Sequence, residues 1–293
     1  MSKIGKMLTR DEGVLVPLVE KFLLETGTDI QIISESDKQI IEKLIMIQSD
    51  RQGERAKRTS FSGGASSSCM RDQSINFLEG IKPERITDPK VALLFDDGNW
   101  RNLKWVLLFN KMGILRKTEE VAHSKKYNVS GTPDAEVDLS AYYEDFEDLV
   151  GVEVKGMHDY EWRKFADGEG DSRWAIGRFM QSHTYMLITG RKFWIAWGEN
   201  KNDQRFEENV IKRNSHVIKY LRRRYKYMLE GRELGMLPAI ECTFDNSDPK
   251  FRYCRNKANC QKLLQNGYPT MKKMKNRTSG DDMVKEVMLA QVQ

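Results

Sequence analysis

Two short segments between residues 131 and 155 carry the strongest chemical signal in this sequence. Both follow the alternating pattern of a β-strand, and an acidic, aromatic loop joins them. The acidic residues of the first segment share one face: Asp134, Glu136 and Asp138. In the second, Glu153 and Lys155 project from the face opposite the valines. Paired carboxylates are typical ligands of Mg²⁺ or Mn²⁺, and a nearby lysine can neutralise a phosphate, but a solvated strand face shows the same alternation.

A helical pattern at residues 173–189 extends this signal. Arg178, Gln181 and Tyr185 are three and four residues apart and therefore share one helix face. A glutamine and a tyrosine one turn apart are a weak signal alone. They become much more specific when they follow an aspartate and a Glu-x-Lys sequence on two neighbouring strands.

Together these residues resemble the PD-(D/E)xK nucleases of the RecB type. That branch includes the AddB nuclease domain, the CRISPR-associated spacer-acquisition exonucleases and many phage proteins. The Pro-Asp motif falls on Pro133 and Asp134, the Glu-x-Lys motif on Glu153, Val154 and Lys155, and the Gln-x-x-x-Tyr motif on Gln181 and Tyr185. The resemblance covers about residues 69–260. It implies an α/β, restriction-endonuclease-like core, with helices flanking a central mixed sheet, and Mg²⁺- or Mn²⁺-dependent cleavage of DNA.

The resemblance also implies a role for each motif residue. Asp134, Glu153 and the backbone carbonyl of Val154 would hold one or two metal ions. Lys155 would orient a water and offset charge on the phosphate. Gln181 and Tyr185 would position the DNA strand or bridge to the lysine.

Two further positions concern the metal shell. Relatives carry Gly-Asn-x-x-His before the core, and here Asn102 stands where the histidine would be. An amide oxygen is a weaker ligand than an imidazole, so this change would shift the metal preference, lower the activity or mark a chain that has lost full catalysis. Glu120 matches a position where relatives often carry an acid, and a solvated charge at a strand end explains it equally well.

The cysteines form a second constellation, one before the core strands and three after them: Cys69, Cys242, Cys254 and Cys260. Relatives with a [4Fe–4S] cluster distribute their cysteines in this way. The match is imperfect, because the position three residues before Cys254 is Phe251. We expect a [4Fe–4S] cluster, with Zn²⁺ or four unrelated thiols as alternatives, because thiolates suit both metals.

A basic run lies further along the chain: Arg222, Arg223, Arg224 and Lys226. With Arg178, these side chains are candidates for DNA contacts, since Lys and Arg neutralise phosphates. A solvated helix face is the alternative interpretation.

Composition agrees with a globular chain that binds a polyanion. The 293 residues are 39% hydrophobic with a net charge of +5 and a pI of about 8.8. No apolar run approaches the length of a membrane span, and the first residues lack a signal-peptide pattern. We therefore expect no membrane association and a location in the cytoplasm, or in the host cytoplasm for a viral protein, where structural disulfides are rare.

Periodicity predicts helices at about 13–25, 36–49, 97–112, 173–189 and 206–229, and strands at about 119–122, 127–130, 134–139, 149–155 and 192–197. We expect an N-terminal helical region with a flexible Gly/Ser-rich linker at 1–68. A nuclease domain with the cysteine cluster follows at 69–276, and a polar tail at 277–293.

The leading hypothesis is a metal-dependent DNA nuclease, most plausibly an exonuclease that acts on single strands or duplex ends in phage-type recombination, replication or degradation. A recombination or replication protein is a candidate partner. The alternative is a catalytically weak DNA-binding or complex-forming protein that keeps the fold. A third hypothesis, an RNA- or protein-interaction domain, requires the motif match to be accidental.

Overall fold

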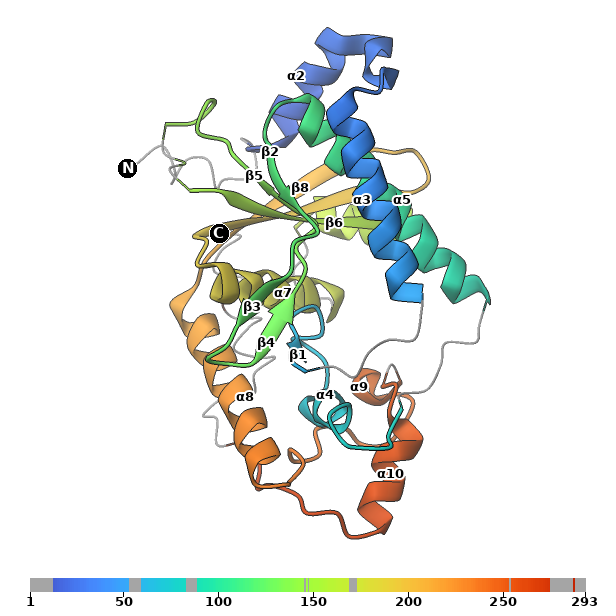
Figure 1. The fold of residues 1–293 in the computed structure, drawn as a ribbon, viewed down its shortest axis with the longest axis vertical. Coiled ribbons are helices and arrows are strands. Elements are labelled where there is room, and N and C mark those ends of the chain that lie inside the picture. The colour runs from blue at the N-terminus through green and yellow to red at the C-terminus, as the bar shows by residue number, and fades with distance from the viewer. Residues whose placement is uncertain are drawn as a thin grey trace.

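The computed structural model describes residues 13–52, 59–82, 89–144, 146, 148–168, 173–252, 254–274 and 287. Within them, a five-stranded sheet with the order β2-β5-β6-β7-β8 forms the centre (Figure 1). Its strands are β2 (Leu115–Thr118), β5 (Ala135–Val137), β6 (Val150–Met157), β7 (Phe193–Asn200) and β8 (Phe206–Lys212). Only β6 and β7 pair in parallel, so the sheet is mixed. This confirms the predicted α/β core with a central mixed sheet.

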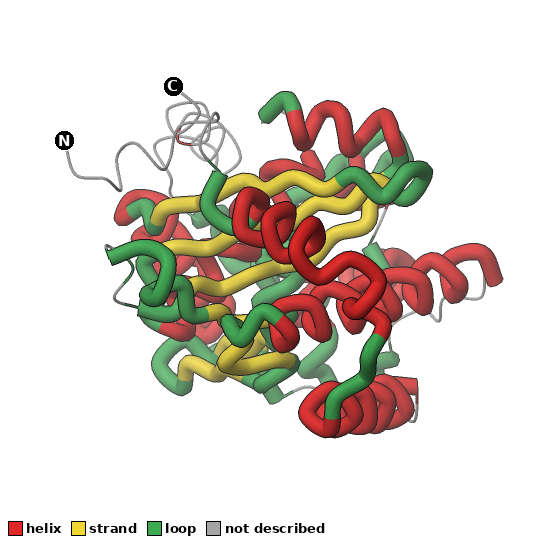
Figure 2. The backbone as a smooth tube through the Cα atoms, turned by 90° about the horizontal axis from the view of Figure 1, so that it is seen from above, coloured by secondary structure: helices red, strands yellow, loops and turns green. Residues whose placement is uncertain are grey.

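Helices cover both faces of the sheet, which forms a layer between them (Figure 2). On one face lie α5 (Pro89–Lys111), α2 (Val16–Thr26), the short 3₁₀ helix η1 (Gly27–Gln31) and α3 (Glu35–Gln52). On the other lie α6 (Asp159–Ala166), α7 (Arg173–Thr189) and α8 (Ser215–Glu233). The N-terminal helices belong to the main core, because Val19 of α2 and Leu44 of α3 are buried in it.

Strand alternation decides which residues reach each face. Val150, Val152 and Val154 of β6 join the core cluster on the α5 side. The alternate residues of β6 therefore point toward α7, and Glu153 and Lys155 are among these. Both faces of the sheet carry apolar residues, since Trp194 and Ala196 of β7 pack on the α7 side, so Glu153 and Lys155 are charged groups within a largely apolar layer.

A second, smaller sheet lies beside α7. Its strands are β1 (Phe61–Ser62), β3 (Ala122–Ser124) and β4 (Val129–Gly131), in the order β1-β4-β3. β1 pairs in parallel with β4, which brings the Gly/Ser-rich segment against the core.

The C-terminal part of the described chain packs against an early helix. A small cluster around Ile75, Leu237 and Cys260 joins α4 (Met70–Ile75) to α10 (Lys257–Gln265), with α9 (Pro249–Arg252) nearby (Figure 1). Segments almost 200 residues apart in the sequence therefore meet at one end of the molecule.

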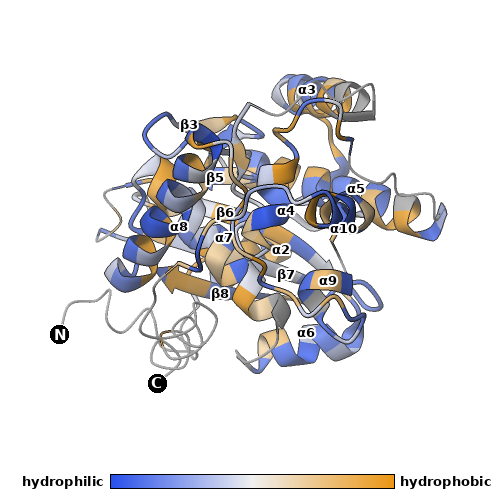
Figure 3. Cartoon of the chain, turned by 90° about the horizontal axis from the view of Figure 1, so that it is seen from below, coloured by the Kyte–Doolittle hydropathy of each residue, from blue (hydrophilic) through white to orange (hydrophobic). Residues whose placement is uncertain are grey.

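Two elements differ from the sequence prediction. The strand predicted at 119–122 is misplaced, because β2 ends at Thr118 and β3 begins only at Ala122. The helix predicted at 206–229 is wrong in its first part, where the chain forms β8 and then begins α8 at Ser215. Asn214 separates β8 from α8. Its side chain accepts hydrogen bonds from the backbone N–H groups of His216 and Val217 and so caps the N-terminus of α8. α8 is amphipathic, and hydrophilic and hydrophobic residues both appear along it (Figure 3).

The Gly/Ser-rich segment also differs from the expected flexible linker. Residues 53–58 lie outside the described residues, but Phe61 and Ser66 are buried. The predicted polar tail at 277–293 lies outside the described residues apart from Val287. None of the helices in the described ranges is both long and apolar enough to cross a lipid bilayer.

Candidate active site

Adjacent strands β5 and β6 bring Asp134, Glu153 and Lys155 together. Asp134 immediately precedes β5, and its Oδ2 accepts a hydrogen bond of 2.8 Å from the backbone N–H of Val154. Lys155 Nζ lies 2.5 Å from Glu153 Oε1. Thr118 on β2 donates to the Asp134 carbonyl at 2.9 Å and so fixes the start of β5. The three sequence-predicted groups thus share one site.

Helix α7 adds Gln181 and Tyr185 to this site. Gln181 Nε2 donates to Glu153 Oε1 at 2.6 Å and lies 3.2 Å from the Tyr185 hydroxyl. Glu153 Oε1 therefore accepts hydrogen bonds from both Lys155 and Gln181. The other oxygen, Glu153 Oε2, is buried and has no hydrogen-bond partner among the described residues.

Arg178 lies one helical turn before Gln181. Its guanidinium group sits 5.2 Å from the ring centre of Phe165, and burial lowers its pKa to about 10. Its charge also reaches Lys155 and opposes protonation there. A half-buried cation beside the catalytic cluster is suited to an anionic ligand.

Burial gives this cluster an unusual protonation balance. Burial, reinforced by the charge of Asp134, raises the pKa of Glu153 to about 7, although Lys155 opposes the rise. Burial acts to lower the pKa of Lys155, but Glu153 and Asp134 outweigh it and raise that pKa. Burial also raises the pKa of Tyr185, so its hydroxyl stays neutral. The site holds a cationic amine beside a carboxyl that titrates near neutral pH.

Asn102 on α5 contacts an acidic side chain. That acid is Glu119 and not its neighbour Glu120, the predicted residue. Asn102 Nδ2 donates to Glu119 Oε1 at 2.9 Å, and Asn102 Oδ1 is buried without a partner among the described residues. Glu120 is exposed and lies 3.7 Å from Lys117. Glu119 has a positive φ of 50°, which turns the chain after β2 and exchanges the directions of the two glutamates. No sequence signal distinguishes these neighbours.

The other carboxylates of the first strand pattern have structural partners. Glu136 is buried and pairs with Arg191 at 2.9 Å, while Asp138 pairs with Arg116 at 3.1 Å. Of the three alternating acids, Asp134 alone is joined to Val154 by a described hydrogen bond.

The donor set is suited to a hard divalent cation. Its oxygens include the open acceptor Glu153 Oε2 and the carboxylate of Asp134, and Asn102 Oδ1 is a further open acceptor beside Glu119. Carboxylate and amide oxygens are the ligands that Mg²⁺ and Mn²⁺ prefer. Among the described residues, no three His, Cys, Asp or Glu side chains converge closely enough to hold a metal ion. A bound cation would therefore also require the backbone carbonyl or water.

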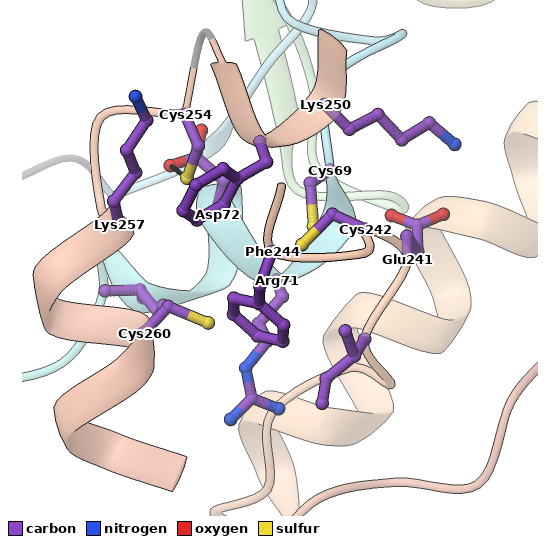
Figure 4. Close-up of a pocket in the computed structure, with 13 residues that line it drawn as sticks. Cys69, Arg71, Asp72, Glu241, Cys242, Phe244, Lys250, Cys254, Lys257 and Cys260 are labelled. Atoms are coloured by element: carbon purple, nitrogen blue, oxygen red, sulfur yellow. Dashed lines mark hydrogen bonds between the residues drawn. The ribbon is translucent and has the colours of Figure 1, made fainter. Parts of the chain in front are cut away.

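The cysteines all line one pocket, formed by α4, α9, α10 and the segment before α9 (Figure 4). Cys69, Cys242, Cys254 and Cys260 are free thiols. Cys254 Sγ lies 3.2 Å from Asp72 Oδ1, to which it donates. Three cations, Arg71, Lys250 and Lys257, and two acids, Asp72 and Glu241, also line the pocket, and the ammonium groups of both lysines point away from the sulfur atoms (Figure 4).

Burial keeps the thiols of Cys69 and Cys254 protonated. Burial, with a contribution from Glu241, raises the pKa of Cys69 to about 12. Burial, with Asp72, raises the pKa of Cys254 as well. A metal that binds here must displace these protons.

The basic residues predicted to bind DNA divide into two groups. Arg222, Arg223 and Lys226 are exposed on α8. Arg224, in the same run, is buried, bonds the Ser68 carbonyl and pairs with Glu241. The helical period separates them, because Arg224 falls on the apolar face.

No protein-family model matches the chain, and no curated protein matches its sequence. Solved structures show a distant likeness. The crystal structure of an alkaline exonuclease (LHK-Exo) from Laribacter hongkongensis is 14% identical, with 70% of this chain and 96% of that chain covered and a TM-score of 0.44. LHK-Exo in complex with dAMP gives the same identity and coverage with a TM-score of 0.42. The structure of SSO0001 is 12% identical, with coverages of 78% and 98% and a TM-score of 0.43. At this distance, the roles of individual residues rest on the geometry described above.

Proposed function

We propose that this chain is a metal-dependent DNA nuclease that hydrolyses phosphodiester bonds. One observation supports the proposal above the others. Asp134, Glu153 and Lys155 form one hydrogen-bonded cluster, in which an oxygen of Glu153 is buried and open. A buried carboxylate with an unused acceptor is costly unless a cation or a donor completes it.

Mg²⁺ or Mn²⁺ would be held by Asp134, Glu153 Oε2 and the Val154 carbonyl, with Asn102 and Glu119 next to them. When bound, such a cation activates a water and stabilises negative charge on the phosphate.

Lys155 is a protonated amine next to Glu153, placed to donate to the attacking water or a phosphate oxygen. Gln181 holds Glu153 by its Oε1, which keeps Oε2 directed toward the cation. The neutral hydroxyl of Tyr185 supports Gln181. Arg178 is placed to neutralise a neighbouring phosphate of the strand.

The proposed substrate is DNA at single strands or duplex ends, in phage-type recombination, replication or degradation. The exposed cations of α8, Arg222, Arg223 and Lys226, would bind the backbone away from the site of cleavage. A recombination or replication protein remains a candidate partner.

The cysteine pocket would hold a [4Fe–4S] cluster rather than Zn²⁺. A single Zn²⁺ requires four thiolates about 2.3 Å from one centre. The four thiols surround a pocket, and no three of the described acidic, His or Cys side chains converge as one ion requires. A cluster with four iron atoms is larger than a single ion, and Arg71, which lines the same pocket, would offset part of its negative charge.

An Mn²⁺-dependent assay on end-labelled linear DNA tests the nuclease, with Lys155→Ala as the variant. We expect loss of cleavage in this variant with an unchanged circular dichroism spectrum, because Lys155 is partly exposed. Retained cleavage would refute the assignment. Closed circular DNA should resist an exonuclease, and the spectrum of anaerobically purified protein should contain the broad visible band of an iron–sulfur cluster.

The second candidate is a catalytically weak DNA-binding or complex-forming protein. Asn102, in place of a stronger ligand, is the observation that favours it. Protein that retards DNA in a gel but releases no label with Mg²⁺ or Mn²⁺ would decide for this alternative.

A further inference from the structure

The Gly/Ser-rich segment lies directly on the catalytic face of α7. We call residues Phe61–Ser68 the glycine–serine strap. It begins as β1, where Phe61 donates to the Asn128 carbonyl at 2.8 Å and Gly63 donates to the Ser130 carbonyl at 2.7 Å. Successive turns then lead to Cys69. The strap therefore connects the small sheet to the cysteine pocket and passes over Gln181 and Tyr185 on the way.

Two buried side chains hold the strap in place. Gln73 closes it like a clip, because its Oε1 accepts from the Ser62 N–H at 3.0 Å and its Nε2 donates to the Ala65 carbonyl at 2.8 Å. Arg224, from α8, donates to the Ser68 carbonyl. Both side chains are almost fully buried, Gln73 at 4% and Arg224 at 3% exposure. Because these buried polar side chains are hydrogen-bonded to the backbone of the strap, they fix its conformation.

The strap and the end of β4 form a slot for the Tyr185 ring. A Cβ atom added at Gly131 would lie 2.2 Å from Tyr185 Cε1, and one at Gly63 would lie 3.1 Å from the same atom. Only glycine leaves room for the ring at the first position, and the second is already tight. A Cβ at Gly64 would lie 3.7 Å from Gln181 Nε2 and from the Tyr185 hydroxyl, an ordinary contact.

The orientation of this ring controls the open oxygen of Glu153. The Tyr185 hydroxyl lies 3.2 Å from Gln181 Nε2, and that amide donates to Glu153 Oε1. If the ring moves, Gln181 loses one of its two partners and can turn toward Oε2. The acceptor proposed to face the cation would then be occupied by an amide.

We propose that the glycine–serine strap positions Tyr185 and Gln181 over Glu153, and that Gly63 and Gln73 are positioning residues for the reaction. This role rests on the proposed nuclease function. The strap touches neither the scissile bond nor the carboxylates, and it acts through the slot around Tyr185.

The two neighbouring glycines give a matched pair of variants. Neither Gly63 nor Gly64 has the left-handed backbone that disfavours alanine. Gly63→Ala crowds the ring by a few tenths of an ångström, and we expect kcat to fall about tenfold with KM nearly unchanged. Gly64→Ala should stay within about twofold of the wild-type kcat. Equal kcat values for the two variants would overturn the proposal.

A second measurement does not depend on catalysis. The side-chain amide protons of Gln181 should exchange slowly and resonate apart from other glutamine amides, because Glu153 and Tyr185 hold them. Gly63→Ala should speed the exchange of these protons, whereas Gly64→Ala, whose Cβ makes only an ordinary contact with the amide, should leave the exchange rate unchanged. An unchanged exchange rate in Gly63→Ala would refute the positioning role even if the wild-type protein has no nuclease activity.

Gln73→Leu serves if Gly63→Ala does not fold. It removes both hydrogen bonds of the clip at nearly constant volume, so we expect the same loss of kcat and the same faster exchange of the Gln181 amide protons. Wild-type behaviour of folded Gln73→Leu would contradict the proposal. If the wild-type protein cleaves no DNA, only the proposed nuclease function is refuted. The NMR measurement on Gln181 still tests whether the strap positions Tyr185 and Gln181.

Discussion

The proposed catalytic cluster, formed by Asp134, Glu153, Lys155, Gln181 and Tyr185, and the cysteine pocket are organised in opposite ways. In the cluster, side chains from β6 and α7 bond one another directly, with distances of 2.5 Å from Lys155 to Glu153 and 2.6 Å from Gln181 to Glu153. In the pocket, four thiols face a common space, and the described contact of Cys254 is to Asp72 rather than to another thiol. In the first site, direct hydrogen bonds fix one oxygen of Glu153 and leave the other open, whereas in the second the thiols meet only around a shared pocket.

The difference follows from the elements that carry each site. β6 is an interior strand with partners on both sides, and α7 packs along the sheet, so the positions of the catalytic side chains are set by the core. The pocket is made by the short helices α4, α9 and α10 with a loop, around a much smaller apolar cluster. We infer that ligand binding contributes to the stability of the pocket, whereas it contributes chiefly to the rate at the catalytic cluster.

The largest expected effect is on catalysis. Glu153→Gln should lower the rate of Mn²⁺-dependent cleavage by about a thousandfold or more, because a neutral amide cannot hold the cation. The melting temperature should not fall, since burial and Asp134 already disfavour the charge of Glu153. Glu144→Gln, in the exposed loop before β6, is the control for a lost surface charge. Wild-type turnover in Glu153→Gln would show that Glu153 is not needed for cleavage, and the contrast between the two sites would then fail.

The next effect is on stability at the other site. Cys69→Ser should reduce bound iron, measured by metal analysis, and lower the melting temperature by about 5–10 °C, because a lost ligand no longer stabilises the native state. Glu153→Gln should leave the iron content unchanged. An unaltered metal content and melting temperature in Cys69→Ser would show that the thiols are unrelated.

A pH series on metal-free protein sharpens the comparison further. The pKa of Glu153 is raised to about 7, so its contribution to stability is fully present at low pH and is lost as the pH rises through that value. Between pH 5 and 8 we expect the free energy of unfolding to fall by about 2 kcal/mol from this group. Denaturant unfolding at each pH measures the change, and Glu153→Gln should remove most of it. The same slope in that variant would assign the effect to another group.

The smallest expected effect concerns the metal preference. Asn102→His should lower the Mn²⁺ concentration needed for half-maximal cleavage by about three- to tenfold, with less change for Mg²⁺, because imidazole suits transition metals better. Asn99→His, one turn earlier on α5, is the matched control. Equal responses of the two variants would exclude Asn102 from the metal shell.

Local pattern was sufficient for most of the fold. The valines of β6 and the spacing of Gln181 and Tyr185 place their neighbours on defined faces, and those faces occur in the structure. The pattern failed where residues were consistent with two elements. The segment at 206–212 reads equally well as helix or strand, and pairing with β7 decides for the strand.

The site shows the same division at the level of single residues. Glu119 and Glu120 are neighbouring glutamates that the sequence cannot tell apart. In the structure, Glu119 has a positive φ and its side chain meets Asn102. Gly/Ser composition is typical of a linker, yet Gly63 lies against the ring of Tyr185. Arg224 belongs to a basic run but is buried to anchor Ser68.

The sequence by itself determined which chemical groups are available and which of them share a strand or helix face, because periods of two and 3.6 residues are properties of the local backbone. Tertiary structure alone decided that the strap closes over Tyr185, that Glu119 meets Asn102 and that the distant cysteines line one pocket. These outcomes depend on contacts between segments far apart in the chain, and no local period encodes such contacts.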